Sequence, residues 1–358
     1  MKVIGIVGTA KNTGKTTTLG AMIAESAAHQ ERLAVTSIGY DGEEIDTITG
    51  LPKPRLFLRA GTLVVTSERC LAHTSAAYRI IRMTDVETAL GRIVIVEITR
   101  DGLIVLAGPN TKKLLRGIID ELGQYGVDRM FVDGSLNRIA AMAAVETMII
   151  TTGASRSREI GFLADESRAI CRLFDLPQMR FTSHDPNAER IRVLDHGGAA
   201  VISELPFGSL YDEDDALRVI QKMTGHASAI LIPHLVSNRA LKALAAGIPR
   251  GRLHTLTIVV ADPTVMLLAG EPIETVRVID DARRGGVDNQ PAFTIAYSQR
   301  MNVAALTVNP FYARQSGHVF IPESIDKTAL LSDVAQAVPV PVFNMRDAGA
   351  QQSLFSLL

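Results

Sequence analysis

The sequence predicts an α/β protein, with a mainly parallel sheet that carries an antiparallel insert, followed by a second α/β domain. Apolar runs typical of strands alternate with amphipathic helical segments along the chain. The chain has 358 residues, which is more than one ordinary hydrophobic core accommodates. The alternation starts again after residue 177, so we expect one domain over residues 1–176 and a second over residues 177–358.

In the first domain, an apolar strand over residues 2–8 precedes a helix that starts at Lys15. Residues 91–108 are typical of a hairpin that turns at Arg100-Asp101-Gly102. Further strands are expected at residues 32–39, 54–61, 62–67, 128–134 and 146–153, and further helices at 109–126 and 157–177.

The second domain repeats the same alternation without a phosphate loop of its own, and we expect it to bind a partner or a substrate. Its strands are expected at residues 198–205, 228–235, 253–262, 301–310, 317–322 and 338–343. Its helices are expected at residues 211–225, 237–247 and 324–337.

Composition limits the classes of partner. A net charge of −1 attracts no polyanion, and the chain lacks Trp for stacking on single strands, so nucleic acid is not an expected partner. No apolar stretch is long enough for a membrane span or a signal peptide. Cys70 and Cys171 have no metal-like spacing and are expected to be buried thiols. We expect a cytoplasmic protein that does not enter a membrane.

The segment "GTAKNTGKTTTLG" begins at Gly8, between the first strand and the first helix. The free N–H groups at a helix start attract anions, and Gly14 lets the backbone wrap closely around phosphate. Lys15 would contact the β- and γ-phosphates, and Thr16 would bind Mg²⁺. We therefore predict a P-loop nucleotide-binding domain. Its nucleotide-binding residues are expected to be Gly8, Thr9, Lys11, Asn12, Thr13, Gly14, Lys15, Thr16 and Thr17.

The loop departs from the common Gly-x-x-x-x-Gly-Lys-Ser/Thr form, because Thr9 occupies the first glycine position. In this it resembles dethiobiotin synthetase and the molybdopterin-guanine dinucleotide biosynthesis adapter, over about the first third of the chain. Both belong to the class that includes the signal-recognition GTPases and the partitioning ATPases. The second lysine of the partitioning ATPases would fall at Ala10, with Lys11 one residue away, so that role is not transferred.

Two aspartates at strand ends are expected to complete a magnesium site, since the carboxyl ends of parallel strands share one edge. Asp133 closes an apolar strand, and Asp41 follows the second strand. With Lys15 they form the expected catalytic set, and with Thr16 the expected metal ligands. For each aspartate, a turn or capping role is the alternative. The neighbouring Glu43, Glu44 and Asp46 are expected to be solvated, and Glu97 to be structural.

Other polar residues leave alternatives open. Asn110 is expected to cap a helix, with anion binding by Lys112 as the alternative. For Arg156 and Arg158, contact with phosphate and simple surface charge are both open. The sequence lacks Asn-Lys-x-Asp, the usual guanine-reading motif, which favours ATP over GTP and leaves GTP as the alternative.

Three longer segments, residues 36–71, 106–138 and 148–155, resemble a subunit of the lysine 5,6-aminomutase reactivase, and so does "TVNPFYARQSGHVFIP". This resemblance implies a slow Mg²⁺-dependent NTPase that helps to reactivate an adenosylcobalamin-dependent aminomutase through a nucleotide-driven switch. Its expected partners are the nucleotide, the aminomutase or another accessory subunit, and a second copy of the chain. The alternatives are an ATP-dependent synthetase of the dethiobiotin type, with Lys53 and Arg55 on its substrate, and a nucleotide-binding adapter.

Overall fold

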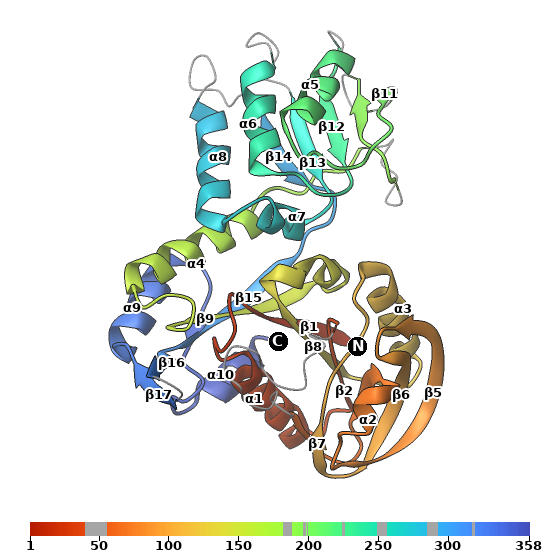
Figure 1. Cartoon of the computed structure of the whole chain (residues 1–358), viewed down its shortest axis with the longest axis vertical. Helices are drawn as coiled ribbons and strands as arrows, with labels where there is room; N and C mark the ends of the chain where they lie inside the picture. The colour runs from red at the N-terminus through yellow and green to blue at the C-terminus, as the bar shows by residue number, and fades with distance from the viewer. Residues whose placement is uncertain are drawn as a thin grey trace. The chain divides into compact units, whose positions relative to one another are not determined.

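The structure of the protein is a computed structural model. It describes residues 1–39, 56–181, 188–195, 198, 200–223, 226–248, 256–284, 293–316 and 319–358. The chain folds into two compact units (Figure 1): unit 1 is Met1–Ala164 together with Asn302–Leu358, and unit 2 is Asp165–Met301.

This division differs from the expected boundary between residues 176 and 177. The last segment of the chain returns to the first sheet, where β15 (Asn302–Asn309) pairs in parallel with β9 (Thr147–Gly153). The apolar run over residues 301–310 is therefore a strand of unit 1, and unit 2 is an insertion in unit 1.

Unit 1 confirms the predicted fold class, α/β with a mainly parallel sheet and an antiparallel insert. Its sheet has nine strands in the order β18-β15-β9-β1-β8-β2-β4-β6-β5. Pairing is parallel from β18 to β4 and antiparallel from β4 through β6 to β5. The other seven strands are β1 (Lys2–Gly8), β2 (Leu33–Ser37), β4 (Leu63–Ser67), β5 (Ala77–Thr88), β6 (Gly91–Arg100), β8 (Arg129–Ser135) and β18 (Val342–Phe343).

The antiparallel insert differs from its expected form. The hairpin expected over residues 91–108 is wrong, because β6 pairs with β5 and β4 while β7 (Gly102–Ile104) pairs with β3 (Leu56–Leu58). Strand β5 was not expected, since its charged residues interrupt the apolar run. The structural role expected for Glu97 is confirmed, because its carboxylate lies 2.5 Å from the Arg79 guanidinium across the β5–β6 pair. A second hairpin, β16 (Phe311–Ser316) with β17 (Val319–Ser324), follows β15.

The helices of unit 1 bury apolar faces against the sheet. In α1 (Lys15–Ala28), Leu19, Met22 and Ile23 are buried. Thr111, not the expected Asn110, caps α3 by accepting a hydrogen bond from the Leu114 N–H. The remaining helices are α2 (Glu68–Leu71), α3 (Lys112–Gly123), the 3₁₀ segment η1 (Leu136–Ala144), α4 (Ile160–Phe174, which continues into unit 2), α9 (Lys327–Ala337) and α10 (Ala350–Ser356).

The two ends of the chain meet beside a buried ion pair. Helix α10 packs along α1 (Figure 1). The Lys2 ammonium donates to the Leu358 carbonyl. The nearly buried Arg129 guanidinium lies 4.3 Å from the centre of the Phe355 ring and donates twice to the Glu31 carboxylate, at 2.8 Å each. These hydrogen bonds from Arg129 hold the pKa of Glu31 below its usual range, against the opposing effect of burial.

Replacing Glu31 with Gln is expected to lower the free energy of unfolding by about 2 kcal/mol at neutral pH, because the buried guanidinium of Arg129 loses its counter-charge. Folding lowers the pKa of Glu31. The Glu31 carboxylate therefore stabilises the fold fully above the pKa of the unfolded chain, about 4.3, and this stabilisation is lost as the pH falls through the pKa of Glu31 in the folded protein. Denaturant titration across this range measures both effects. The matched control is Glu87→Gln, whose exposed partner Arg92 lies 3.8 Å away. An equal loss in the two variants would contradict this account.

Unit 2 is a second α/β layer structure. Its five strands have the order β11-β10-β12-β13-β14, parallel from β12 to β14 and antiparallel where β10 meets β11 and β12. Strands β10 and β14 and helices α7 and α8 were not expected. The elements are β10 (Arg192–Leu194), β11 (Val201–Glu204), α5 (Glu213–Lys222), β12 (Ala229–Ile232), α6 (Asn238–Gly247), β13 (Thr257–Val260), α7 (Pro263–Leu268), α8 (Pro272–Arg284) and β14 (Thr294–Tyr297).

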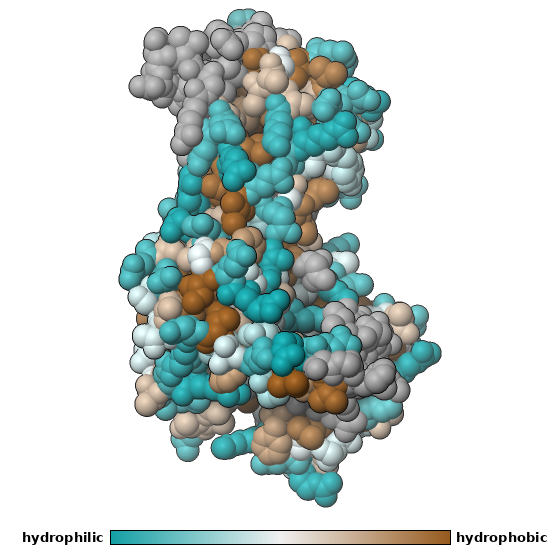
Figure 2. All heavy atoms as spheres, turned by 60° about the vertical axis from the view of Figure 1, so that its left-hand side comes forward, coloured by the Kyte–Doolittle hydropathy of each residue, from teal (hydrophilic) through white to brown (hydrophobic). Residues whose placement is uncertain are grey.

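On the face shown in Figure 2, hydrophobic residues form separate patches among hydrophilic ones. Within the ranges that the structure describes, no helix combines the length and the apolar character needed to cross a bilayer. Cys70 and Cys171 are both buried, as expected, and burial raises the pKa of Cys171 to about 12.

Candidate functional site

The predicted phosphate loop leaves the middle of the unit 1 sheet. Strand β1 lies between β8 and β9, with Gly8 level with Ser135 on one side and Thr151 on the other. All three strands run parallel, so their carboxyl ends open at one edge, where ligands of α/β sheets bind. The loop over residues 9–14 crosses this edge and leads directly into α1.

The backbone of the loop is suited to wrap around an anion. Asn12 and Gly14 have left-handed backbone conformations, with φ of 62° and 96°. No side chain caps the start of α1, and the first bond of the helix runs from the Thr18 N–H to the Gly14 carbonyl. The N–H groups of the first turn are therefore available to a ligand, and Thr16 and Thr17 are exposed.

Threonine hydroxyls hold the loop against the end of β9. The Thr9 hydroxyl donates to the Thr152 hydroxyl at 3.1 Å, and the Thr13 and Thr151 hydroxyls are 3.0 Å apart. The Thr13 hydroxyl also donates to the Ala10 carbonyl. Thr13 is 1% exposed, so its side chain is buried beneath the loop and supports it. The part of Thr13 that could contact a ligand is its backbone.

The structure brings Lys15 and Asp133 together. The Lys15 ammonium donates to both carboxylate oxygens of Asp133, at 2.7 and 2.8 Å, and both side chains remain about one quarter exposed. Desolvation raises the pKa of Asp133 above its usual range, although the charge and hydrogen bond of Lys15 oppose the shift. The Asp133 carboxylate and the Lys15 ammonium thus face each other beside the loop. A phosphate group could take the place of the carboxylate beside Lys15, and a cation could take the place of the ammonium beside Asp133.

The residues present fit a magnesium ion bound together with a nucleotide. Thr16 offers an exposed hydroxyl at the start of α1, and Asp133 offers a carboxylate near the carboxyl end of β8. Among the described residues, no group of three His, Cys, Asp or Glu could hold a metal without other ligands. Phosphate oxygens and water would have to complete the ligand set.

Asp41, expected at the site, lies outside the described part of the chain, as do Lys53 and Arg55 of the synthetase alternative. Glu43, Glu44 and Asp46, which are expected to be solvated, lie outside it too.

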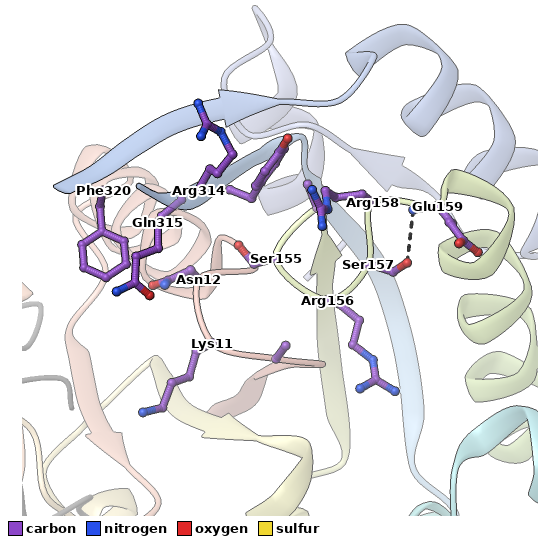
Figure 3. Close-up of a pocket in the computed structure, with 14 residues that line it drawn as sticks. Lys11, Asn12, Ser155, Arg156, Ser157, Arg158, Glu159, Arg314, Gln315 and Phe320 are labelled. Carbon is purple, nitrogen blue, oxygen red and sulfur yellow. Dashed lines mark hydrogen bonds between the residues drawn. The ribbon is translucent and has the colours of Figure 1, made fainter. Parts of the chain in front are cut away.

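A groove of about 800 Å³ adjoins the loop. Its walls are residues 10–12 of the loop, residues 154–159 after β9, and the β16–β17 hairpin. Figure 3 shows the polar ends of Asn12, Ser155 and Gln315 around this hollow, with Arg158 above and Lys11 and Arg156 extending downward in the view. The structure therefore places Arg156 and Arg158 beside the loop.

Hydrogen bonds to one carboxylate connect the two strands of the hairpin that forms a wall of the groove. The Glu323 carboxylate accepts hydrogen bonds from the Tyr312 hydroxyl at 2.6 Å and from the Arg314 guanidinium at 2.5 Å. The hydrogen bond from Tyr312 has the largest effect and, together with that from Arg314, keeps the pKa of Glu323 below its usual range. The hydrogen bond to Glu323 in turn raises the pKa of Tyr312. Arg158 stands 5.6 Å from the Tyr312 ring, so residues on both sides of the groove are linked.

Sequence reasoning missed Asn309, Tyr312 and Gln315 as residues of this site. Asn309 ends the strand expected over residues 301–310, which the sequence places in the second domain, and Tyr312 and Gln315 follow that strand. An apolar strand that ends in Asn-Pro, followed by aromatic and polar residues, is the signal that could have identified them.

No protein-family model matches the chain, and no curated protein matches it. Among solved structures, it is similar to a MinC:MinD cell division protein complex from Aquifex aeolicus, with 15% identity over 46% of this chain and 63% of that chain and a TM-score of 0.25. It is also similar to pNOB8 ParA bound to nonspecific DNA, with 12% identity over 49% and 62% of the two chains and a TM-score of 0.27.

Both matches span less than two thirds of the other chain. Their low TM-scores say nothing of what this chain binds. The resemblance to aminomutase reactivase subunits gains no support from them, and the expectation that nucleic acid is not a partner stays a prediction.

Proposed function

We propose that this protein binds a nucleoside triphosphate with Mg²⁺ on the loop between β1 and α1 and hydrolyses it slowly. The observation that carries the proposal is the Lys15–Asp133 pair at the mouth of a loop with left-handed Asn12 and Gly14 and an uncapped helix start. The loop supplies N–H donors and the Lys15 ammonium, and β8 brings the Asp133 carboxylate to within 2.7 Å of that ammonium, which are the groups that a magnesium-bound triphosphate requires.

Each residue then has a definite task. Lys15 leaves Asp133 and contacts the β- and γ-phosphates, which neutralises part of their charge. Asp133, released from Lys15, and the Thr16 hydroxyl would hold Mg²⁺, the carboxylate directly or through water. Mg²⁺ would balance the charge that develops on the phosphates during transfer. Asp41 stays a predicted ligand.

We assign the nucleoside part of the ligand to the groove. Its volume of about 800 Å³ lies within the range typical of small-molecule sites. The amides of Asn12 and Gln315 can both donate and accept hydrogen bonds, which suits the edge of a base. The rings of Tyr312 and Phe320 and the Arg158 guanidinium offer flat faces on which a base can stack. ATP is the favoured nucleotide, and GTP is the alternative.

Replacing Gln315 with Ala is expected to weaken binding of Mg·ATP about tenfold, because the base edge loses a hydrogen-bonding partner. Binding of pyrophosphate, which reaches only the loop, is expected to be unchanged. Calorimetry with both ligands measures the difference. The control is Gln336→Ala on the exposed face of α9. If Gln315→Ala binds ATP like the wild type, or loses pyrophosphate equally, the groove does not hold the base.

The accessory role toward a cobalamin-dependent aminomutase stays a prediction from the sequence resemblance, as do the synthetase and adapter alternatives and a partner-binding role for unit 2. The test is to add the purified protein with ATP and Mg²⁺ to an inactivated aminomutase. Recovery of mutase activity that requires Lys15 would support the role. Fast turnover of a small carboxylic acid, without recovery, would favour the synthetase.

A further inference from the structure

Asn309, the last residue of β15, contacts three segments of the candidate site at once. Its side-chain N–H donates to the Asn12 carbonyl of the phosphate loop at 2.9 Å, and its side-chain oxygen accepts from the Phe311 N–H of the hairpin at 3.2 Å. Its backbone carbonyl accepts from the Ala154 N–H at 2.9 Å. From these contacts we infer that Asn309 is a positioning residue that holds the loop in its phosphate-binding form, an inference that rests on the proposed function.

The two side-chain bonds require an amide. One end must donate to the loop and the other must accept from the hairpin, and only Asn offers both groups at this length. Asp could accept from Phe311 but could not donate to Asn12. Ala could do neither.

The bond to Asn12 sets the direction of one peptide group. In a planar trans peptide, the carbonyl of Asn12 and the N–H of Thr13 point in opposite directions. Asn309 draws the carbonyl toward β15, so the Thr13 N–H is turned away from β15. Asn12 adopts φ of 62°, an uncommon conformation for a residue other than Gly, and the bond from Asn309 helps to hold it there.

Two glycines allow Asn309 to lie this close. A Cβ on Gly14 would approach the Asn309 Cβ to 3.2 Å, and φ at Gly14 is 96°. A Cβ on Gly153 would come within 2.1 Å of the Asn309 carbonyl oxygen. The backbone of the loop and the end of β9 thus both pack against Asn309.

Because Asn309 also bonds to the first residue of β16, it connects the loop to the hairpin wall of the groove. The phosphate end and the nucleoside end of one ligand would therefore be positioned by the same side chain.

The test compares Asn309→Asp and Asn309→Ala with the wild type, using calorimetry with Mg·ATPγS and with pyrophosphate. Both variants are expected to lose about tenfold in affinity for each ligand, since each lacks the bond to Asn12. Hydrogen exchange without nucleotide is expected to be faster in residues 9–14 and 311–316, and unchanged in β1 and β8. Asn302→Asp, exposed at the start of the same strand, is the matched control and is expected to bind like the wild type.

The neutral variant separates the hydrogen bond from charge. If Asn309→Asp loses affinity and Asn309→Ala does not, repulsion by the new carboxylate explains the loss and the inference is overturned. It is also overturned if both variants lose affinity only in proportion to a lower melting temperature. Failure of the proposed function is distinguishable, because the wild type and Lys15→Ala would then bind Mg·ATPγS equally poorly.

Discussion

Lys15→Ala is expected to lower the affinity for Mg·ATP by at least about 100-fold, the largest effect on binding of any single change in this chain. The ammonium is the one charged group at the start of α1, and its present partner, Asp133, is an anion that a phosphate would replace. Without Lys15, the Asp133 carboxylate would also face the triphosphate uncompensated. Titration calorimetry with a nonhydrolysable ATP analogue measures the loss.

Lys11→Ala is the matched control for this prediction. Lys11 lies in the same loop, is exposed and lines the groove, and Figure 3 shows its side chain extending downward in the view. Replacing Lys11 is expected to lower the affinity for Mg·ATP by less than about tenfold, because only one charge is lost and solvent partly screens it. An equal loss at both positions would show that general positive charge, not the position of Lys15, governs binding.

Asp133→Asn is expected to reduce Mg²⁺-dependent hydrolysis by at least about 100-fold while nucleotide still binds. The amide keeps the shape of the carboxylate but cannot hold Mg²⁺ or its water in the same way. Binding without Mg²⁺ is expected to be unchanged or tighter, because one negative charge near the triphosphate is gone. Phosphate release measured against Mg²⁺ concentration, beside binding in EDTA, separates the two effects.

The same carboxyl group predicts a pH dependence. Desolvation raises the pKa of Asp133 in the folded protein above its usual range. The contribution of this carboxyl group to the free energy of unfolding is therefore greatest below the ordinary Asp pKa of about 3.9, and it decreases as the pH rises through the pKa of the folded protein. The kcat/KM of Mg²⁺-dependent hydrolysis, which reports the ligand-free protein, is expected to fall when the pH drops through the raised pKa, because the carboxyl takes up a proton. Asp133→Asn removes this titration from the stability profile. A wild-type profile that coincides in shape with that of Asp133→Asn would contradict the assignment.

Much of the site could be predicted because its signals are local. A strand, a loop with Gly14 and Lys15, and an amphipathic helix are contiguous in the chain, and Asp133 lies near the carboxyl end of β8, which pairs with β1. Such signals need only the alternation of apolar and polar residues and the edge that parallel strands share.

The parts that could not be predicted depend on contacts between distant segments. Nothing in the local sequence indicates that residues 302–309 pair with β9 rather than with a sheet of their own, because an apolar strand fits either sheet. For that reason Asn309 and the hairpin after it were assigned to the wrong domain. The hairpin expected at Arg100-Asp101-Gly102 failed in the same way, since β7 pairs with the distant β3.

The most direct measurement is a crystal structure of the protein with Mg²⁺ and a nonhydrolysable ATP analogue. The expected density is a triphosphate against the N–H groups of residues 13–17, with Lys15 moved from Asp133 to the phosphates and the nucleoside in the groove beside Gln315. Nucleotide bound elsewhere, or a loop without ligand in which Lys15 still holds Asp133 at saturating nucleotide, would contradict the account.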